Sequence, residues 1–313
     1  MADLIVLAIG GNSLIRDEQH RTVQDQWVLA RETCHHIAEI IQAGHQVVVT
    51  HGNGPQVGFI IRRSELARHE LHEVPLDSCD ADTQGAIGYM IQQSLENEFL
   101  RRGLSKSAVA LVTQVEVDAD SPAFRDPSKP IGSFMDEATA RARAAQERWT
   151  IREDASRGWR RVVPSPVPRA IVEIEAIRTL VRAGFVVTAV GGGGIPVVRD
   201  AEGILHGVEA VIDKDYASSL LATALGADQF IISTAVERVC LNYRQPDERP
   251  LDRLTANEAR RHLADGQFGE GSMAPKIRSV IRYLEQGGRR AIITDPPHLA
   301  LAASGMAGTR ITR

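Results

Sequence analysis

The sequence contains few of the residues and patterns that would place it in several large protein classes. Its three cysteines, Cys34, Cys79 and Cys240, lie far apart and form no CxxC pair, which argues against a zinc site or a disulfide framework. No apolar run approaches the roughly 20 residues that span a bilayer, and residues 4–9 lack the basic leader of a signal peptide. The net charge of −4 argues against nucleic acid or an anionic membrane as a partner. The expected location is the cytoplasm.

Several familiar nucleotide-binding motifs are also missing. There is no GxxxxGK[ST] segment and no HRD or DFG triplet, which excludes a P-loop NTPase and a protein kinase. Residues 52–58 miss the dinucleotide fingerprint GxGxxG by one position, so a dehydrogenase of that type is disfavoured. His69 and His72 are spaced i, i+3 and not the i, i+4 of a zinc-protease helix. We interpret that segment as a polar helix face.

The sequence does contain a regular alternation of short apolar runs and longer amphipathic ones. Apolar residues make up 43% of the 313 residues, as in folded globular chains. Short apolar runs predict strands at residues 4–9, 46–49, 108–117, 185–190, 229–233 and 291–294. Helical periodicity predicts helices at about 23–43, 83–102 and 170–183, and others that start near 213, 256 and 276. This alternation predicts an α/β fold with a mostly parallel sheet covered by helices on both faces.

The alternation is interrupted between about residues 118 and 168. Pro122, Pro127 and Pro130 precede a charged tract, and a second proline-rich segment follows at residues 164–168. We interpret this stretch as an inserted excursion with stiffened ends, either a lid or a protruding subdomain. Its composition alone would favour a solvated surface loop.

Three of the predicted strands end in a glycine cluster. The clusters are Gly10-Gly11-Asn12, Gly52-Asn53-Gly54 and the run Gly191 to Gly194. In a parallel sheet the carboxyl ends of the strands share one edge, and ligands bind in the crevice there. Glycine lets the backbone approach a ligand closely and directs N–H groups toward an anion. Three such turns in one chain predict an anion-binding site.

Lysines are few beside the many arginines, and three of them occupy unusual positions. Lys129 lies between prolines in the excursion, Lys214 lies between two aspartates at a strand-to-helix junction, and Lys276 follows Pro275 at an expected helix start. Phosphoryl transfer needs cations, because its transition state spreads negative charge over three oxygens. Any one of these lysines alone would be interpreted as a surface residue, but together they are compatible with a phosphoryl-transfer site.

A set of long motifs resembles the carbamate kinases of the amino acid kinase superfamily. The matching segments are residues 9–13, 51–58, 82–89, 128–132, 160–166, 191–196, 207–215, 271–277 and 308–311. They occur in order from the first predicted strand to the last. The resemblance implies an open αβα sandwich, the reaction ATP + carbamate ⇌ ADP + carbamoyl phosphate, Mg²⁺ as the cofactor of ATP or ADP, and a homodimer. It also implies a role in ATP formation during catabolism of nitrogen compounds such as arginine.

The resemblance further implies two lobes. Residues 1–205 would form the acceptor lobe, with the subdomain at about 118–168, and residues 206–313 the nucleotide lobe. The glycine loops would bind the small anionic groups. Gly10, Gly11 and Asn12 would contact the transferring phosphoryl group, Gly52, Asn53 and Gly54 would hold carbamate, and Gly191, Gly192 and Gly193 would border the same site.

Charged residues complete the implied site. Lys214 and Lys276 would neutralise the transferred and β-phosphate groups, Asp215 would hold both lysines, and Lys129 would cover the acceptor side. Several amino acid kinases carry a lysine two residues before the first Gly-Gly pair, where this chain has Ala8. Lys129 is the substitute we expect for that missing cation, which favours carbamate kinase over acetylglutamate or aspartate kinases.

The nucleotide would lie against the end of the strand predicted at residues 229–233 and against the start of the helix predicted near residue 276. Ser233, Ala235 and Met273 are the expected contacts there, together with Lys214 and Lys276. Two alternatives stay open at this point. One is a kinase for another small acid or nucleotide on the same fold, and the other is a catalytically weak regulator that binds nucleotide. Carbamate is already nucleophilic, so the leading hypothesis requires no general base and relies on positioning and electrostatics.

Overall fold

The computed structural model describes residues 2–11, 14–15, 17, 19–153 and 158–313. The described residues form an eight-stranded central sheet. Its strands are β1 (Leu4–Ile9), β2 (Gln46–His51), β3 (Ala108–Ala110), β9 (Val186–Thr188), β12 (Gln229–Ser233), β15 (Arg253–Thr255), β16 (Arg290–Thr294) and β17 (Thr309–Thr312). They lie in the order β15-β17-β16-β12-β1-β2-β9-β3, and the run from β16 to β3 is parallel. Only β17 and its parallel neighbour β15 run the other way. The predicted mostly parallel α/β sheet is confirmed.

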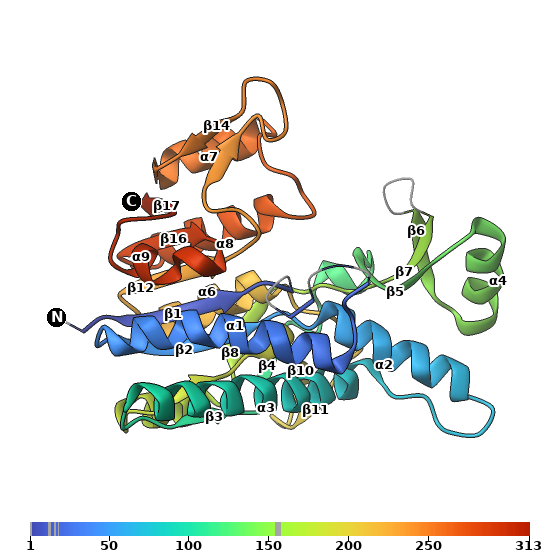
Figure 1. Cartoon of the computed structure of the whole chain (residues 1–313). Coiled ribbons are helices and arrows are strands. Elements are labelled where there is room, and N and C mark those ends of the chain that lie inside the picture. The colour runs from blue at the N-terminus through green and yellow to red at the C-terminus, as the bar shows by residue number, and fades with distance from the viewer. Residues whose placement is uncertain (1, 12–13, 16, 18, 154–157) are drawn as a thin grey trace.

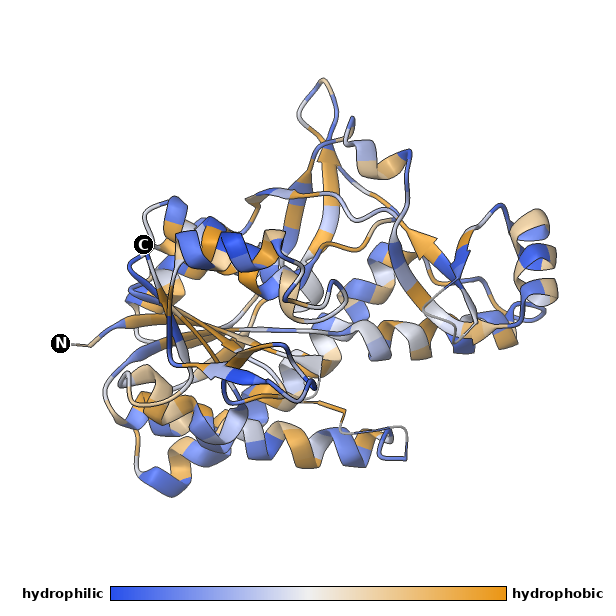
Figure 2. Ribbon diagram, turned by 90° about the horizontal axis from the view of Figure 1, so that it is seen from above, coloured by the Kyte–Doolittle hydropathy of each residue, from blue (hydrophilic) through white to orange (hydrophobic). Residues whose placement is uncertain are grey.

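Alternation along β1 explains why both faces of the sheet are covered. Ile5, Leu7 and Ile9 point to one face, whereas Val6 and Ala8 point to the other. The first face packs against α1 (Val23–Gln42), α3 (Leu76–Arg102) and α9 (Leu299–Ala303). The second packs against α5 (Ile174–Arg182), α6 (Lys214–Leu225) and α8 (Met273–Glu285), and α7 (Ala256–Ala264) packs on α8. The three layers are visible in Figure 1, and Figure 2 shows the apolar strands enclosed between helices.

Helix ends follow local sequence signals. Thr22 and Asp25 form a capping box at the start of α1, and Gly44 follows its end with φ +97°, a left-handed conformation that suits glycine. The helix predicted to start at Thr83 begins earlier, at Leu76, directly after Pro75. Leu76, Cys79 and Asp80 are buried, so the inward face of α3 extends two turns beyond the prediction. Asp80 breaks the apolar pattern, which is why periodicity alone missed these turns.

Two predicted elements in the middle of the chain were wrong in extent. The single strand expected at 108–117 is divided into β3 and β4 (Gln114–Val117) by residues 111–113. Thr113 lies at this break because the Gln84 side chain bonds to both its N–H and its carbonyl. β4 then enters a second sheet, of order β11-β10-β4-β8, formed with β8 (Pro168–Ile171), β10 (Ile195–Arg199) and β11 (Leu205–Gly207). Because β8 pairs with β4, the helix expected from residue 170 begins only at Ile174.

The excursion between residues 118 and 168 contains a small folded unit. β5 (Lys129–Met135), β6 (Thr150–Glu153) and β7 (Trp159–Val163) form a three-stranded sheet in the order β5-β7-β6, and α4 (Glu137–Glu147) packs on it. This unit, which we call the protruding subdomain, projects from the main body beside α2 (Gly54–Ala67) (Figure 1). Further along the chain, after β12, β13 (Val239–Leu241) and β14 (Arg249–Leu251) form an antiparallel hairpin.

The segment of His69 and His72 is not part of a helix. The amides of Glu70 and Leu71 both bond to the carbonyl of Ala67, which closes α2 in a turn at that point. The predicted polar helix face was therefore wrong: His69 lies in a turn and His72 in the irregular segment that follows it. Among the helices that the structure describes, none combines the length and apolarity needed to cross a membrane.

Candidate active site

The carboxyl ends of β1 and β2 bring the first two glycine clusters together. The amide of Gly52 donates to the carbonyl of Ile9 at 3.2 Å. A Cβ atom at Gly52 would lie 3.3 Å from Cδ of Lys214 and 3.6 Å from the amide nitrogen of Gly11. Gly11, Gly52 and Lys214 are therefore direct neighbours, although they are distant in sequence. Asn12, which the sequence assigns to the same cluster, lies outside the described residues.

The four-glycine run folds against this pair of loops in a conformation that needs glycine. Gly192 and Gly193 have φ values of +71° and +106°. A Cβ atom at Gly191 would overlap Nε2 of His51, and one at Gly192 would overlap Nδ2 of Asn53. The sequence thus places its third glycine cluster in close contact with the second, at the same edge of the sheet.

A buried ion triad lies beside these loops. Asp215 accepts hydrogen bonds from Nζ of Lys214 at 2.7 Å and from Nζ of Lys276 at 3.1 Å. Its side chain is 4% exposed. Burial opposes ionisation of Asp215, but the charges and hydrogen bonds of the two lysines outweigh burial and lower its pKa to about 2. Burial also lowers the pKa of Lys276, and the charge of Asp215 opposes that shift. The triad fixes two ammonium groups at the mouth of the glycine loops.

Lys129 reaches the same region from the protruding subdomain. It is the first residue of β5, and its Nζ bonds to Oδ2 of Asp213 at 3.1 Å. Asp213 is also the N-cap of α6, because its Oδ1 accepts from the amides of Asp215 and Tyr216. One carboxylate therefore joins the subdomain lysine to the helix that begins with Lys214. Sequence reasoning did not assign this role to Asp213.

The inner face of α3 supplies polar side chains that sequence reasoning also missed. Nδ2 of Asn53 donates to Oδ1 of Asp80 and to Oγ1 of Thr83, each at 2.9 Å. Gln84, one helical turn after Asp80, donates from Nε2 to the carbonyl of Gly191 at 2.9 Å. Burial raises the pKa of Asp80 to about 7, the hydrogen bond from Asn53 opposes that shift and the charge of Asp77 adds to it. The motif at residues 82–89 was the available signal, because it places Thr83 and Gln84 in a segment shared with the family.

His51 ends β2 directly below the loops and is buried. Its Nδ1 donates to the carbonyl of Gly52 at 3.1 Å. Burial lowers its pKa to about 4; the hydrogen bond to Gly52 opposes this shift and the charge of Lys214 adds to it. The ring is therefore neutral at physiological pH and supports the loops by packing.

A cavity of about 470 Å³ lies beside the start of α8. Ala235 and Met273, two of the expected nucleotide contacts, line it. Its other lining residues are Thr234, Val236, Cys240, Asn242, Tyr243, Gln245, Gly266, Gln267, Phe268, Gly269 and Ser272. Ser233, also expected there, is buried at the end of β12, and its carbonyl would lie 3.1 Å from a Cβ atom at Gly10. Most of these lining residues belong to loops whose sequence carries no motif.

The first turn of α8 connects this cavity to the triad. Met273 is the first residue of the helix and Lys276 is three positions later, a rise of about 4.5 Å along the axis. The geometry therefore provides a partly open cavity, then two fixed ammonium groups, and then a glycine-lined loop region. That order suits a ligand with an apolar end, a chain of negative charges and a small acceptor beyond it.

Comparisons with known proteins agree with this geometry. The profile of the amino acid kinase family matches residues 3–295. The chain is 46% identical to the carbamate kinase-like protein YahI of Escherichia coli, with both chains fully covered, and 46% identical to the carbamate kinase of Thermococcus kodakarensis, with 99% of each covered. The structure of carbamate kinase from Giardia lamblia bound to AMP-PNP superposes with a TM-score of 0.93 at 40% identity, covering 99% of this chain and 98% of that one.

The chain belongs to the amino acid kinase family, a family of phosphotransferases. Within the family, its full-length relatives include carbamate kinases and carbamate kinase-like proteins from bacteria and archaea. The fold and the family that the sequence motifs indicated are thereby confirmed. A kinase that uses ATP also requires a divalent cation to accompany the nucleotide.

Proposed function

We propose that this chain catalyses the reversible reaction ATP + carbamate ⇌ ADP + carbamoyl phosphate. The observation that carries the proposal is the buried Asp215 with Lys214 and Lys276, placed between a nucleotide-sized cavity and three converging glycine loops. The names of the full-length relatives support the choice of acceptor.

In this mechanism the chain positions charge and does not transfer protons. Carbamate already carries a nucleophilic oxygen, so no general base is needed. Lys214 and Lys276 would neutralise the oxygens of the phosphoryl group in transit and of the β-phosphate, and Asp215 would keep both ammonium groups in place. The amides of Gly10, Gly11 and Asn12 would contact the transferring group. Those positioned donors cost no reorganisation when charge develops in the transition state.

The acceptor would bind at the start of α2. Gly54 begins this helix and Asn53 precedes it, and the free amides of a first helical turn attract an anion. Gly52 and residues 191–193 would close the site from the other sides. Lys129 would exchange Asp213 for the acceptor or the phosphoryl group and so supply the cation that Ala8 does not provide.

The nucleotide would occupy the cavity beside α8, with Ala235 and Met273 against it, Ser233 at its edge and Lys214 and Lys276 at its phosphates. We propose that Mg²⁺ enters as part of the nucleotide complex. The described residues contain no group of three or more His, Cys, Asp or Glu side chains that could hold a metal ion, so phosphate oxygens and water would supply most of its ligands.

We further propose the cellular setting that the family implies. The chain would work as a cytoplasmic homodimer, its partners would be ATP or ADP and carbamate or carbamoyl phosphate, and it would form ATP during catabolism of nitrogen compounds, arginine among them. The two lobes, 1–205 and 206–313, would supply the acceptor and nucleotide sides. Sedimentation of the purified chain tests the dimer directly.

ATP formation from ADP, Mg²⁺ and carbamoyl phosphate tests the proposed reaction. The wild type should form ATP, and Lys214→Ala should lower kcat by roughly 10²–10³-fold because a preorganised cation is lost from the transition state. Lys106→Ala is the matched control. Lys106 is exposed and precedes β3, at the opposite edge of the sheet, so its removal should leave the rate unchanged.

Two outcomes would contradict the proposal. If the wild type binds ADP but forms no ATP from carbamoyl phosphate, the catalytically weak regulator becomes the better description. If it forms ATP and Lys214→Ala matches the wild type, the reaction stands but the assigned role of the lysine is wrong.

A further inference from the structure

The side-chain amide of Asn53 is held in one orientation by α3. Its Nδ2 donates to both Oδ1 of Asp80 and Oγ1 of Thr83. The Thr83 hydroxyl donates its own hydrogen to the main-chain carbonyl of Asp80 at 2.9 Å. The hydroxyl oxygen is therefore restricted to accepting from Asn53. Both hydrogens of the Asn53 amide are consequently committed to α3.

The opposite orientation of this amide is disfavoured. It would turn Oδ1 of Asn53 toward a hydroxyl whose only hydrogen is used elsewhere and, when Asp80 is ionised, toward a carboxylate oxygen that can only accept. All three side chains are buried, with at most 4% of their surface exposed, so solvent cannot repair the lost bonds. Unpaired polar groups in such a place are costly.

The one polar atom of Asn53 left for a ligand is an acceptor. Its Oδ1 is on the branch of the amide directed away from Asp80 and Thr83, and no described residue donates a hydrogen bond to it. Asn53 stands between Gly52 and Gly54, at the start of α2, where the proposed function places the acceptor substrate. A lone acceptor atom beside an anion-binding helix end fits a small anion that also carries an N–H group.

We propose that Asn53 determines acceptor specificity by accepting a hydrogen bond on Oδ1 from the amino group of carbamate or carbamoyl phosphate, with Asp80 and Thr83 as the positioning residues. This inference rests on the proposed function and states how its acceptor is recognised. The helix amides and lysines bind the charged oxygens, which carbamate shares with acetate. Only the amino group separates the two anions, because a methyl group has similar size but cannot donate.

Discrimination between carbamoyl phosphate and acetyl phosphate tests the inference. The value to measure is the ratio of kcat/KM for ATP formation from the two acyl phosphates, with ADP and Mg²⁺ held constant. This ratio does not depend on the fraction of folded enzyme. The wild type should prefer carbamoyl phosphate by roughly 10–100-fold, since acetyl phosphate leaves a buried acceptor unpaired.

Variants of the two positioning residues give matched pairs. Thr83→Val removes the acceptor for one amide hydrogen and should reduce the ratio about fivefold, whereas Thr83→Ser keeps the hydroxyl and should retain it. Asp80→Leu removes the other acceptor and should bring the ratio closer to one, whereas Asp80→Asn keeps a carbonyl oxygen in place and should retain the preference. Each pair separates the hydrogen bond from mere changes in packing.

The inference is overturned if the wild type uses both acyl phosphates equally well. It is also overturned if Thr83→Val and Asp80→Leu lower both rates in proportion and leave the ratio at the wild-type value. In either case the proposed function survives, because ATP is still formed from carbamoyl phosphate. A wild type that forms no ATP from carbamoyl phosphate would contradict the proposed function itself.

Discussion

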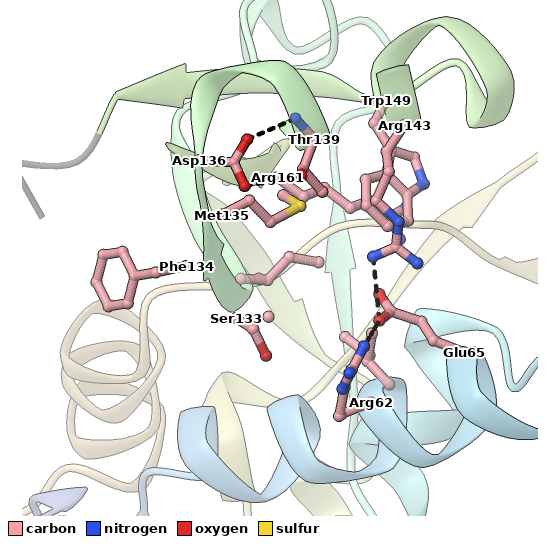
Figure 3. A pocket seen from close by; sticks show the side chains of 13 residues that line it. Arg62, Glu65, Ser133, Phe134, Met135, Asp136, Thr139, Arg143, Trp149 and Arg161 are labelled. Atoms are coloured by element: carbon pink, nitrogen blue, oxygen red, sulfur yellow. Dashed lines mark hydrogen bonds and ion pairs between the residues drawn. The ribbon is translucent and has the colours of Figure 1, made fainter. Parts of the chain in front are cut away.

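Two regions of the molecule hold charged and polar side chains in opposite ways. At the glycine loops, the polar contacts are buried and run between elements of the main body, as between Asn53 and Asp80 or Asp215 and Lys276. Between α2 and α4, the protruding subdomain is held by arginine–glutamate pairs that are partly exposed. Glu65 of α2 accepts from Arg62 of its own helix and from Arg143 of α4, at 3.2 and 3.1 Å (Figure 3).

The subdomain has further partly exposed contacts that involve arginine. Arg68 of α2 pairs with Glu147 of α4 at 2.7 Å. Trp149 lies between Arg143 and Arg161, whose guanidinium carbons are 4.7 and 5.0 Å from its ring centre. Arg143, Trp149 and Arg161 also line a cavity of about 500 Å³ between α2 and the subdomain, so packing there is incomplete.

This difference predicts rigid glycine loops and a weakly attached protruding subdomain. Removing one partner of a buried polar pair leaves the other desolvated and unpaired, at a cost of about 3–5 kcal/mol for a charge. Partly exposed ion pairs contribute only about 0.2–1 kcal/mol each and weaken with salt. The glycine loops therefore have one arrangement, whereas the subdomain that carries Lys129 is held by several small and separable contacts.

The largest effect should come from disturbing the rigid region at Gly192. Gly192→Ala places a Cβ atom on the Asn53 amide at a left-handed φ, so the acceptor loop must shift, and kcat/KM for carbamoyl phosphate should fall by roughly 10²-fold. Gly203→Ala is the matched control. Gly203 has a φ of +84° with no atom within 4 Å of the added methyl group. The Gly203→Ala variant should therefore keep its activity and lose only about 1 kcal/mol of unfolding free energy. Equal activity in the two variants would contradict the rigid-loop description.

A pH effect of intermediate size should come from Asp80. Because burial raises its folded pKa to about 7, above its ordinary value of 3.8, the folded state resists ionisation. The stabilising contribution is complete below pH 4 and is lost as pH rises to about 7. Relative to Asp80→Asn, the wild type should lose on the order of 3 kcal/mol of unfolding free energy over that interval. Urea unfolding of both proteins across this pH range measures the difference; parallel curves would show that Asp80 ionises freely.

The smallest effect should come from the attachment of the subdomain. Glu65→Gln weakens two partly exposed ion pairs, so the free energy of unfolding should fall by about 1 kcal/mol or less, and high salt should abolish the difference. Amide exchange in α4 should become faster. Glu175→Gln, which removes a pair with Arg178 inside α5, should leave exchange in α4 unchanged. If Glu65→Gln instead lost much unfolding free energy and the loss did not depend on salt, this contact would resemble the buried pairs at the glycine loops.

The sequence predicted the sheet, its main helices and the meeting of its glycine clusters, because these depend on periodicity and on a rule about parallel strands. The lysines carried a further signal. The chain has only four, and Lys129, Lys214 and Lys276 lie at the candidate site. A chain that otherwise uses arginine retains lysine where a compact ammonium group fits.

The rest could not be predicted because it depends on contacts between distant elements. Asp80 and Thr83 look like surface residues of a helix until α3 is packed against the loop of Asn53. Asp213 resembles an ordinary N-cap until the protruding subdomain brings Lys129 to its second oxygen. The cavity beside α8 is lined mostly by loop residues, whose positions no periodicity describes.

The pairing of lysines with aspartates has a consequence for the charge balance of the site. Lys129, Lys214 and Lys276 face Asp213 and Asp215, which leaves a single net positive charge among these five side chains. In the proposed reaction, the phosphates would therefore meet ammonium groups that already have carboxylate partners, and Asp215 would keep Lys214 and Lys276 in place. Lys129 would be the group that passes from carboxylate to phosphate and back in each turnover. Because its net charge is small, neither the charged substrates nor the charged products are held so tightly that turnover stops in one direction.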